Sequence, residues 1–257
     1  MGARRSFAAC VLGMLWVFPG GLPHGTARSA ELVIITGQGT TPGVKEVAAA
    51  FASQSGHKVT VIQEDGPALE ARLASGGPAD LIASSPVQIA DLVKRGKVVA
   101  ESVTPFVMAG LGLSVRAGLA KPDISTIEAY KAALLAAKSI GYSRGCSGTN
   151  AAEGIEKLGL AGELKAKTVL TTNGPVVEYL ARGDIDLGIQ QTNIMLGAPG
   201  TEYVGALPGF LNKPCPSSVA LMARAKEIDA ARTMMRFMLS PEAAPLLRKT
   251  FVEPAKS

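Results

Sequence analysis

Short apolar segments alternate with segments of helical periodicity along most of the chain, and this alternation restricts the fold more than any other feature. Thr41 and Pro42 suit the N-cap and first position of a helix, and Gly56 suits its end. Strands are predicted at 32–36, 58–63 and 81–83, and further helices at 68–75 and 87–95. Strands and helices that alternate in this way predict a parallel sheet covered by helices on both faces.

The alternation restarts after an extended stretch at 106–116. Ser125 and Glu128 have the spacing of a capping box, and Ser240 and Pro241 that of the cap and first position of the last helix. Helices are predicted at 125–137, 149–158 and 176–182, strands at 139–143, 168–170, 187–190 and 217–222, and a Pro- and Gly-rich connection at 198–216. Two such series predict an α/β protein of two lobes, each a mainly parallel sheet flanked by helices.

The first thirty residues read as an export signal. Arg4 and Arg5 supply positive charge, residues 7–18 are almost continuously apolar, and residues 20–30 are small and polar. We therefore expect a signal peptide at 1–30, a mature chain from about Glu31, and a periplasmic location. The remaining 227 residues (257 minus 30) are enough to form two lobes, each with its own core.

The charge balance excludes a nucleic-acid partner. Lysine and arginine exceed the acids by 26 to 21, and removing Arg4, Arg5 and Arg28 with the signal leaves 23 to 21. The sequence has no basic run, and aromatic residues make up only 5% of it. We expect a monomer that binds a small molecule.

Two cysteines, Cys146 and Cys215, remain after the signal, in a compartment that oxidises thiols. A disulfide requires their Cα atoms to lie within roughly 4.4 to 6.8 Å of each other, and the sequence leaves open whether they do. These cysteines and one histidine show no metal-ligand spacing, so neither a metal nor a cofactor is expected.

The candidate binding residues follow the predicted strands, because ligands of parallel sheets bind at the carboxyl ends of strands and the N-termini of helices. A single loop of this kind is more often a cap or turn, but its recurrence in both series favours a ligand site. Arg144 would hold a carboxylate or oxyanion through charge-assisted hydrogen bonds. The candidates are Gly39, Thr40, Asp65, Gly66, Ser84 and Ser85 in the first series, and Arg144, Ser147, Asn173, Gly174, Gln190 and Gln191 in the second.

Two enzyme motifs occur without the residues they need. Residues 141–145 match G-x-S-x-G, yet the only histidines are His24 and His57, neither of them downstream of the serine. Residues 37–42 begin like a dinucleotide fingerprint, but Pro42 stands where the third glycine would allow close helix packing. Neither a serine hydrolase nor a nicotinamide enzyme is expected.

Several segments resemble the molybdate-type periplasmic binding proteins of ABC importers: 44–51, 77–84, 231–237 and 239–243. The resemblance covers nearly the whole mature chain. It implies the type II periplasmic-binding-protein fold, with 31–113 and 215–257 in one lobe, 114–214 in the other, and a ligand cleft that closes by a hinge. It also implies an ABC permease as partner, and ligand contacts near Gly39, Asp65, Ser147, Asn173 and Gln191.

The resemblance weakens at the ligand positions. Molybdate binders of this family usually have serines at the first two positions and a tyrosine at the last, whereas this chain has Gly39, Asp65 or Gly66, and Gln191. A carboxylate pointing into the cleft would oppose a bare dianion, by several kcal/mol when desolvated. A small carboxylate ligand is therefore preferred on residue grounds. The alternative is that Asp65 caps the following helix and never meets ligand.

Residues 173–178 and 187–191 also look like a branch of the family that includes a periplasmic aconitate isomerase. Moving the double bond of aconitate needs one base that removes a proton and returns it to another carbon. Glu64 or Asp65 would be that base, and Arg144 would hold the substrate. The first hypothesis is a carrier that delivers its ligand to a membrane permease, and the alternative is a carboxylate isomerase on the same scaffold. The fold alone does not separate them.

Overall fold

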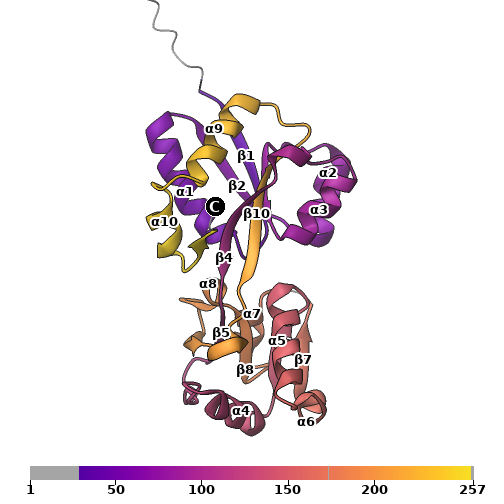
Figure 1. Ribbon diagram of the computed structural model, residues 1–257, viewed down its shortest axis with the longest axis vertical. Coiled ribbons are helices and arrows are strands. Elements are labelled where there is room, and N and C mark those ends of the chain that lie inside the picture. The colour runs from indigo at the N-terminus through magenta and orange to yellow at the C-terminus, as the bar shows by residue number, and fades with distance from the viewer. Residues whose placement is uncertain (1–28, 173, 256–257) are drawn as a thin grey trace, which may run out of the picture.

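The computed structural model describes residues 29–172 and 174–255 of the 257. Two sheets form two lobes stacked along the long axis of the molecule (Figure 1). The expected signal peptide lies outside the described residues except for its last two. Within the described residues, no helix is long and apolar enough to cross a bilayer.

Lobe 1 is built on a six-stranded sheet of order β11-β4-β10-β3-β1-β2. Its strands are β1 (Glu31–Thr36), β2 (Lys58–Gln63), β3 (Leu81–Ser84), β4 (Thr104–Ala109), β10 (Cys215–Leu221) and β11 (Glu253–Pro254). Its helices are α1 (Thr41–Ser55), α2 (Gly66–Ser75), α3 (Pro86–Lys94), η1 (Ala100–Ser102), α9 (Ile228–Met238) and α10 (Ala244–Lys249).

Lobe 2 is built on a five-stranded sheet of order β7-β6-β8-β5-β9. Its strands are β5 (Leu111–Arg116), β6 (Ile140–Ser143), β7 (Thr168–Thr171), β8 (Leu187–Gln191) and β9 (Thr201–Ala206). Its helices are α4 (Ile127–Ala136), α5 (Cys146–Lys157), α6 (Ala161–Leu164), η2 (Lys165–Lys167), α7 (Val176–Arg182), α8 (Thr192–Met195) and η3 (Gly209–Leu211).

The predicted two-lobed α/β fold is confirmed, with mixed sheets. In each lobe three strands are parallel, β2-β1-β3 in one and β7-β6-β8 in the other. The remaining strands pair antiparallel, including those that carry the chain between the lobes. The parallel strands bring their carboxyl ends, and the loops that follow them, to the space between the lobes.

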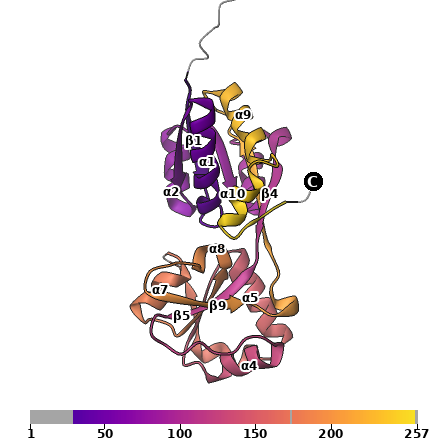
Figure 2. The ribbon, with the colours of Figure 1, turned by 90° about the vertical axis from the view of Figure 1, so that its left-hand side faces the viewer.

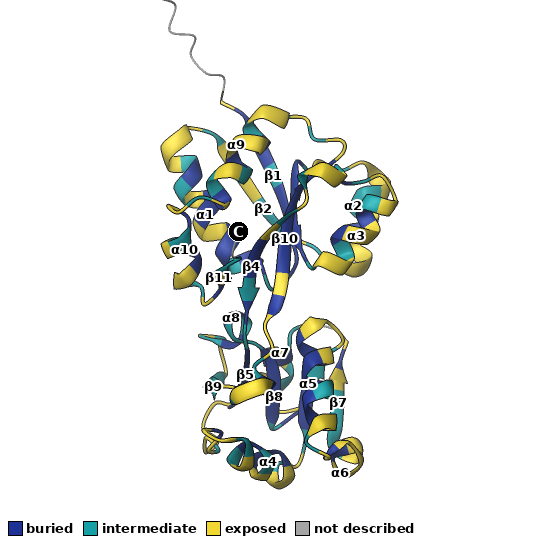
Figure 3. Ribbon diagram, in the orientation of Figure 1, coloured by how far each residue is buried: buried dark blue, intermediate teal, exposed yellow. Residues whose placement is uncertain are grey.

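Helices cover both faces of the lobe 1 sheet because alternate strand residues point to opposite sides. Ile34 packs with the residues of α1, α9 and α10, whereas its neighbour Ile35 packs with those of α2 and α3. Figure 2 shows the first group of helices on one face, and Figure 3 shows that the buried residues concentrate in the central strands. Lobe 2 has its own core, which includes the buried Tyr130.

The chain crosses from lobe 1 to lobe 2 at Gly110, between β4 and β5, and returns just before β10. The predicted extended stretch 106–116 is thus two strands in different sheets. The expected boundary after residue 113 falls inside β5, because residues 111–113 already pair with β8. The expected return at 215 coincides with the first residue of β10.

The three predicted N-cap residues Thr41, Ser125 and Ser240 do not cap their helices. Thr40, not Thr41, is the N-cap residue of α1. Thr126 caps α4 by accepting from the N–H of Ala129, while the N–H of Ser125 donates to Asp123. The last helix begins at Ala244, because residues 240–244 form successive turns.

The Pro- and Gly-rich connection also contains an unpredicted strand, β9, at the edge of the second sheet. Edge strands need only one neighbour, so the short apolar runs that mark inner strands are not required there.

Candidate functional site

A cleft of about 810 Å³ lies between the lobes, at the carboxyl ends of both sets of parallel strands. All the predicted binding residues that the structure describes line it, together with Glu64 and both cysteines. They are Gly39, Thr40, Asp65, Gly66, Ser84 and Ser85 on the lobe 1 wall, and Arg144, Ser147, Gly174, Gln190 and Gln191 on the lobe 2 wall. Asn173 lies outside the described residues.

Asp65 provides an acidic group on the lobe 1 wall. It stands at the N-cap position of α2, but its side chain makes no capping hydrogen bond. Its Oδ2 instead accepts from the backbone N–H of Gln38 at 3.0 Å, and its Oδ1 lies close over Gly37. Of the two alternatives left open by the sequence, the structure therefore has the side chain in the cleft rather than on the helix.

The environment of Asp65 favours its protonated form. The residue is exposed to the cleft, but the protein around it partly desolvates the carboxyl group and raises its pKa above the usual value. The N–H of Gln38 lowers the pKa by a smaller amount. A rise in this direction makes the Asp65 carboxylate a stronger base than an ordinary aspartate.

Glu64, the other candidate base, is engaged by Arg72. The guanidinium makes two hydrogen bonds to the carboxylate, at 2.5 and 2.8 Å. These bonds lower the pKa of Glu64 and keep it ionised. Glu64 is therefore a weaker base than Asp65 and is tied to its own lobe.

The hydroxyl groups on the lobe 1 wall also form hydrogen bonds within that lobe. The buried Thr40 side chain contacts the carbonyl oxygens of Gly37 and Ala83, at 3.0 and 2.7 Å. Ser85 caps α3 by accepting from the N–H of Gln88, and Ser84 donates to the Gln88 side chain. The hydroxyl groups of these residues are therefore bonded within lobe 1, whereas the Asp65 carboxyl group is exposed to the cleft.

The lobe 2 wall is rich in hydrogen-bond donors. The N-cap of α5 is Gly145, which has no side chain to cap the helix, so the N–H groups of Cys146, Ser147 and Gly148 have no intrahelical acceptor. The positive end of the helix dipole lies at the same place. Arg144 directly precedes this turn, is exposed, and makes no ion pair with the described residues.

Gly148 allows α5 to start so close to the sheet. A Cβ atom at this position would overlap the carbonyl group of Ser143, the last residue of β6. Ser147 is buried beside it, with its Oγ 3.4 Å from that of Ser143. His57 lies elsewhere, bonded to the backbone of Ala30 at the other end of the first sheet. Ser143, the serine of the G-x-S-x-G motif, thus lies beside another serine and not beside His57.

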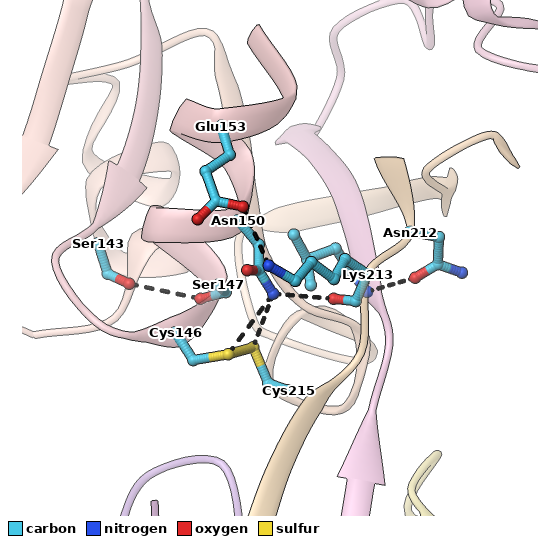
Figure 4. Close-up of a disulfide and its surroundings, with 9 residues drawn as sticks. Ser143, Cys146, Ser147, Asn150, Glu153, Asn212, Lys213 and Cys215 are labelled. Carbon is cyan, nitrogen blue, oxygen red and sulfur yellow. Dashed lines mark hydrogen bonds and ion pairs between the residues drawn. A yellow bond between two sulfur atoms is a disulfide. The ribbon is translucent and has the colours of Figure 1, made fainter. Parts of the chain in front are cut away.

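A disulfide between Cys146 and Cys215 joins α5 to the first residue of β10 (Figure 4). The Cα atoms are 5.9 Å apart, within the range a bridge requires. The Asn150 amide donates to the Lys213 carbonyl at 3.1 Å and contacts both sulfur atoms. The donor-rich wall of lobe 2 is thereby anchored to the strand that returns to lobe 1.

Gln190 and Gln191 lie against lobe 1 instead of opening freely into the cleft. Gln190 is 2% exposed and donates to the Gln38 side chain at 3.0 Å. Gln191 packs against Gly39, where a Cβ atom would overlap its amide oxygen. Sequence reasoning missed the importance of Gln38, because nothing local distinguishes it from other residues of a glycine-rich turn.

Two α/β lobes with a polar cleft between them define a binding protein that holds its ligand at the lobe interface. Residues 32–253 match the family of bacterial extracellular solute-binding proteins, and the chain belongs to that family. The family resemblance predicted from the sequence is confirmed. No group of three or more histidine, cysteine or acidic side chains capable of holding a metal occurs in the part of the chain that the structure describes.

Two relatives of the chain have different named functions. The chain is 29% identical to an aconitate isomerase of Pseudomonas sp over 229 residues, covering 87% of both chains. It is 24% identical to a molybdate-binding protein of Rhodobacter capsulatus over 233 residues, covering 87% of this chain and 88% of the relative.

Among solved structures, the periplasmic molybdate-binding protein of Azotobacter vinelandii has a similar fold. The TM-score is 0.69 at 20% identity, over 88% of this chain and all of that one. At this identity the similarity concerns the fold alone.

Proposed function

We propose that this chain captures a small polycarboxylate between its lobes, in the periplasm. The observation that carries the proposal is the arrangement of charged groups on the two walls. One wall has Arg144, which makes no ion pair with the described residues, and the uncapped N-terminus of α5, and the other wall has Asp65. Arg144 and the N–H groups of α5 suit a ligand carboxylate. Asp65 suits a second polar group of the ligand that carries a hydrogen.

The charge of Asp65 argues against a bare oxyanion. An ionised carboxylate near a dianion raises the free energy of the complex by several kcal/mol once both are desolvated. The cleft volume of about 810 Å³ also falls in the range of roughly 300 to 1,000 Å³ that is usual for organic ligands. A hydroxylated or unsaturated carboxylate fits both properties.

As a carrier, the protein would act as a monomer and deliver its ligand to an ABC permease of the inner membrane. Ligand binding would close the lobes about the two connecting segments, at Gly110 and before β10.

A second candidate function, isomerisation of aconitate, is favoured by the position and raised pKa of Asp65 and by the aconitate isomerase relative. Ionised Asp65 would take a proton from the methylene carbon. The electron pair would delocalise over the allylic system, and the same proton would return to the former vinyl carbon. The double bond moves, no cofactor is consumed, and Arg144 with the α5 N–H groups would hold the carboxylates in place.

The first experiment is a melting-temperature screen of the chain from residue 31 against citrate, cis-aconitate, trans-aconitate, molybdate, tungstate, sulfate and phosphate. A ligand at a hundred times its dissociation constant adds about 2.7 kcal/mol of stability. We expect a shift with the tricarboxylates. A shift with molybdate and tungstate only would refute the proposal.

Asp65→Asn separates the carrier from the isomerase. A carrier keeps or gains affinity for the anion, whereas an isomerase that uses this base binds cis-aconitate without converting it to the trans isomer. Full turnover by the variant would exclude Asp65 as the base.

A further inference from the structure

Gln190 has both ends of its amide occupied at the lobe interface. Its Oε1 accepts from the N–H of Val176, the first residue of α7, at 3.0 Å. Its Nε2 donates to the Oε1 of Gln38, on lobe 1, at 3.0 Å. With only 2% of its surface exposed, Gln190 has little freedom to turn toward a ligand. Its side chain is therefore held in one orientation, extending from lobe 2 to lobe 1.

Gln38 continues this path to the acidic group of the cleft. The same residue whose side chain is held by Gln190 donates its backbone N–H to Asp65 Oδ2 at 3.0 Å. The following residue, Gly39, packs on Gln191 and accepts from Asn193 at 2.8 Å. The turn 37–39 is therefore held between lobe 2 and Asp65.

Gln38 also lines a second interlobe cavity of about 670 Å³, which includes Asn193 and Lys249 but lacks Asp65 and Arg144. Gln38 lines both cavities, whereas its partner Gln190 lines only the first. Asn193 lines only the second cavity and makes another cross-lobe hydrogen bond, to the carbonyl of Gly39, and among the described residues its side chain has no bond to Gln38.

We propose that Gln190 is a positioning residue that lets lobe 2 set the orientation of Asp65 on lobe 1 through the turn at Gln38. Lobe contact and the functional carboxyl group are then linked by two successive hydrogen bonds, from Gln190 to Gln38 and from Gln38 to Asp65. The inference rests on the proposed function in one respect, that Asp65 meets the ligand. The link itself is a property of the protein alone.

The test compares Gln190→Leu and Gln38→Ala with the control Asn193→Ala. Both test variants remove the Gln190 to Gln38 bond, and Gln38→Ala keeps the buried Gln190 in case its replacement impairs folding. The control removes a cross-lobe bond of similar length to the same turn, at Gly39, and leaves both hydrogen bonds of the link in place. The ligand-free readout is the carboxyl ¹³C resonance of Asp65 in protein labelled at aspartate, assigned with Asp65→Asn.

We expect the Asp65 resonance to move in both test variants and to stay in place in Asn193→Ala. An unchanged resonance in a folded Gln38→Ala protein would overturn the proposal, as would an equal movement in the control. If the resonance moves as expected but the wild-type protein binds no tricarboxylate, the positioning role stands and the proposed function fails.

Where the wild-type protein turns over aconitate, kcat should fall about tenfold or more in Gln190→Leu with little change in KM, because a misplaced reacting group loses far more rate than binding. Where it only binds, the effect of Asp65→Asn on citrate affinity should be smaller in the Gln190→Leu background than in the wild type. Strict additivity of the two changes would contradict the link.

Discussion

Helices α1, α2 and α3 of lobe 1 all have proline at their first or second position, whereas α5 of lobe 2 begins with Cys146, Ser147 and Gly148 and keeps all its N–H donors. The charged groups differ as well: the lobe 1 wall has Asp65, and the lobe 2 wall has Arg144, which makes no ion pair with the described residues. The two walls thus have the same strand-and-helix architecture but present different chemical groups to the cleft. Under the proposed function, lobe 2 would hold a carboxylate of the ligand, and Asp65 of lobe 1 would contact another polar group of it.

The disulfide offers the largest test of this division, because it anchors the donor-rich wall. Replacing Cys146 and Cys215 by serine should lower the free energy of unfolding by about 4 kcal/mol, since the bond closes a loop of sequence separation 69. For a chain of this size that is a fall in Tm of about 10 °C, measurable by calorimetry.

Reductant is the control for this prediction. It should lower the Tm of the wild-type protein toward that of the double variant and leave the double variant unchanged. A double variant as stable as the oxidised wild type would show that the bond does not anchor α5.

The start of α5 gives the next effect. Gly148→Ala should destabilise lobe 2 by about 3 kcal/mol or more, because the added methyl group overlaps the Ser143 carbonyl. Gly145→Ala is the matched control, since its Cβ atom would meet only the Ser143 hydroxyl, at 3.9 Å. Urea unfolding of both variants measures the difference, and equal stabilities would contradict the close approach.

Arg144 tests where the anion is held. Arg144→Gln should weaken tricarboxylate binding by about 2 kcal/mol, roughly thirtyfold, because it removes a charged hydrogen-bond donor. Arg95→Gln makes the same charge change on the outer surface of lobe 1, where Arg95 pairs with Glu70 and Asp91. Calorimetric titration should show almost unchanged affinity in that variant. Similar losses in both would indicate a general charge effect.

The neighbouring acids Asp65 and Glu64 should give the smallest effects, of opposite sign. Burial raises the folded-state pKa of Asp65, so its ionised form lowers stability at neutral pH, and this penalty fades as pH falls through that pKa. Asp65→Asn should therefore be slightly more stable than wild type at pH 7, by less than about 1 kcal/mol because the group is partly solvated. The advantage should shrink toward pH 4.

Glu64→Gln serves as the counterpart. Arg72 lowers the folded-state pKa of Glu64, so its charge contributes stability above the unfolded pKa, and this contribution is lost as pH falls through the folded one. The variant should be less stable than wild type at pH 7, and the difference should disappear in acid. Melting curves at pH 7 and pH 4 that show the same sign for both variants would refute the assignment.

The sequence predicted well the features that depend on local pattern. Apolar periodicity located the parallel strands and most helices, and Gly56 ends α1 in the left-handed conformation that favours glycine. The strand β9 and the start of α10 were not predicted, because edge strands and successive turns lack a strong periodic signal.

For the site, the sequence predicted which residues line the cleft, but not which residues they form hydrogen bonds with. The loops after parallel strands had to meet at one end of each sheet, so residues such as Asp65, Arg144 and Ser147 could be named in advance. Their partners come from distant parts of the chain. Gln190 contacts Gln38 across 152 positions, and no local pattern encodes such a pair.

By itself, the sequence determined the α/β class, the two lobes and the set of loops at the cleft, because these follow from short-range periodicity and from the shared direction of parallel strands. Only the tertiary structure decided that Cys146 bonds to Cys215, that Glu64 is neutralised by Arg72, and that Asp65 enters the cleft. These outcomes depend on distances between groups on different elements. Packing of whole elements sets such distances, and a local sequence pattern carries no record of them.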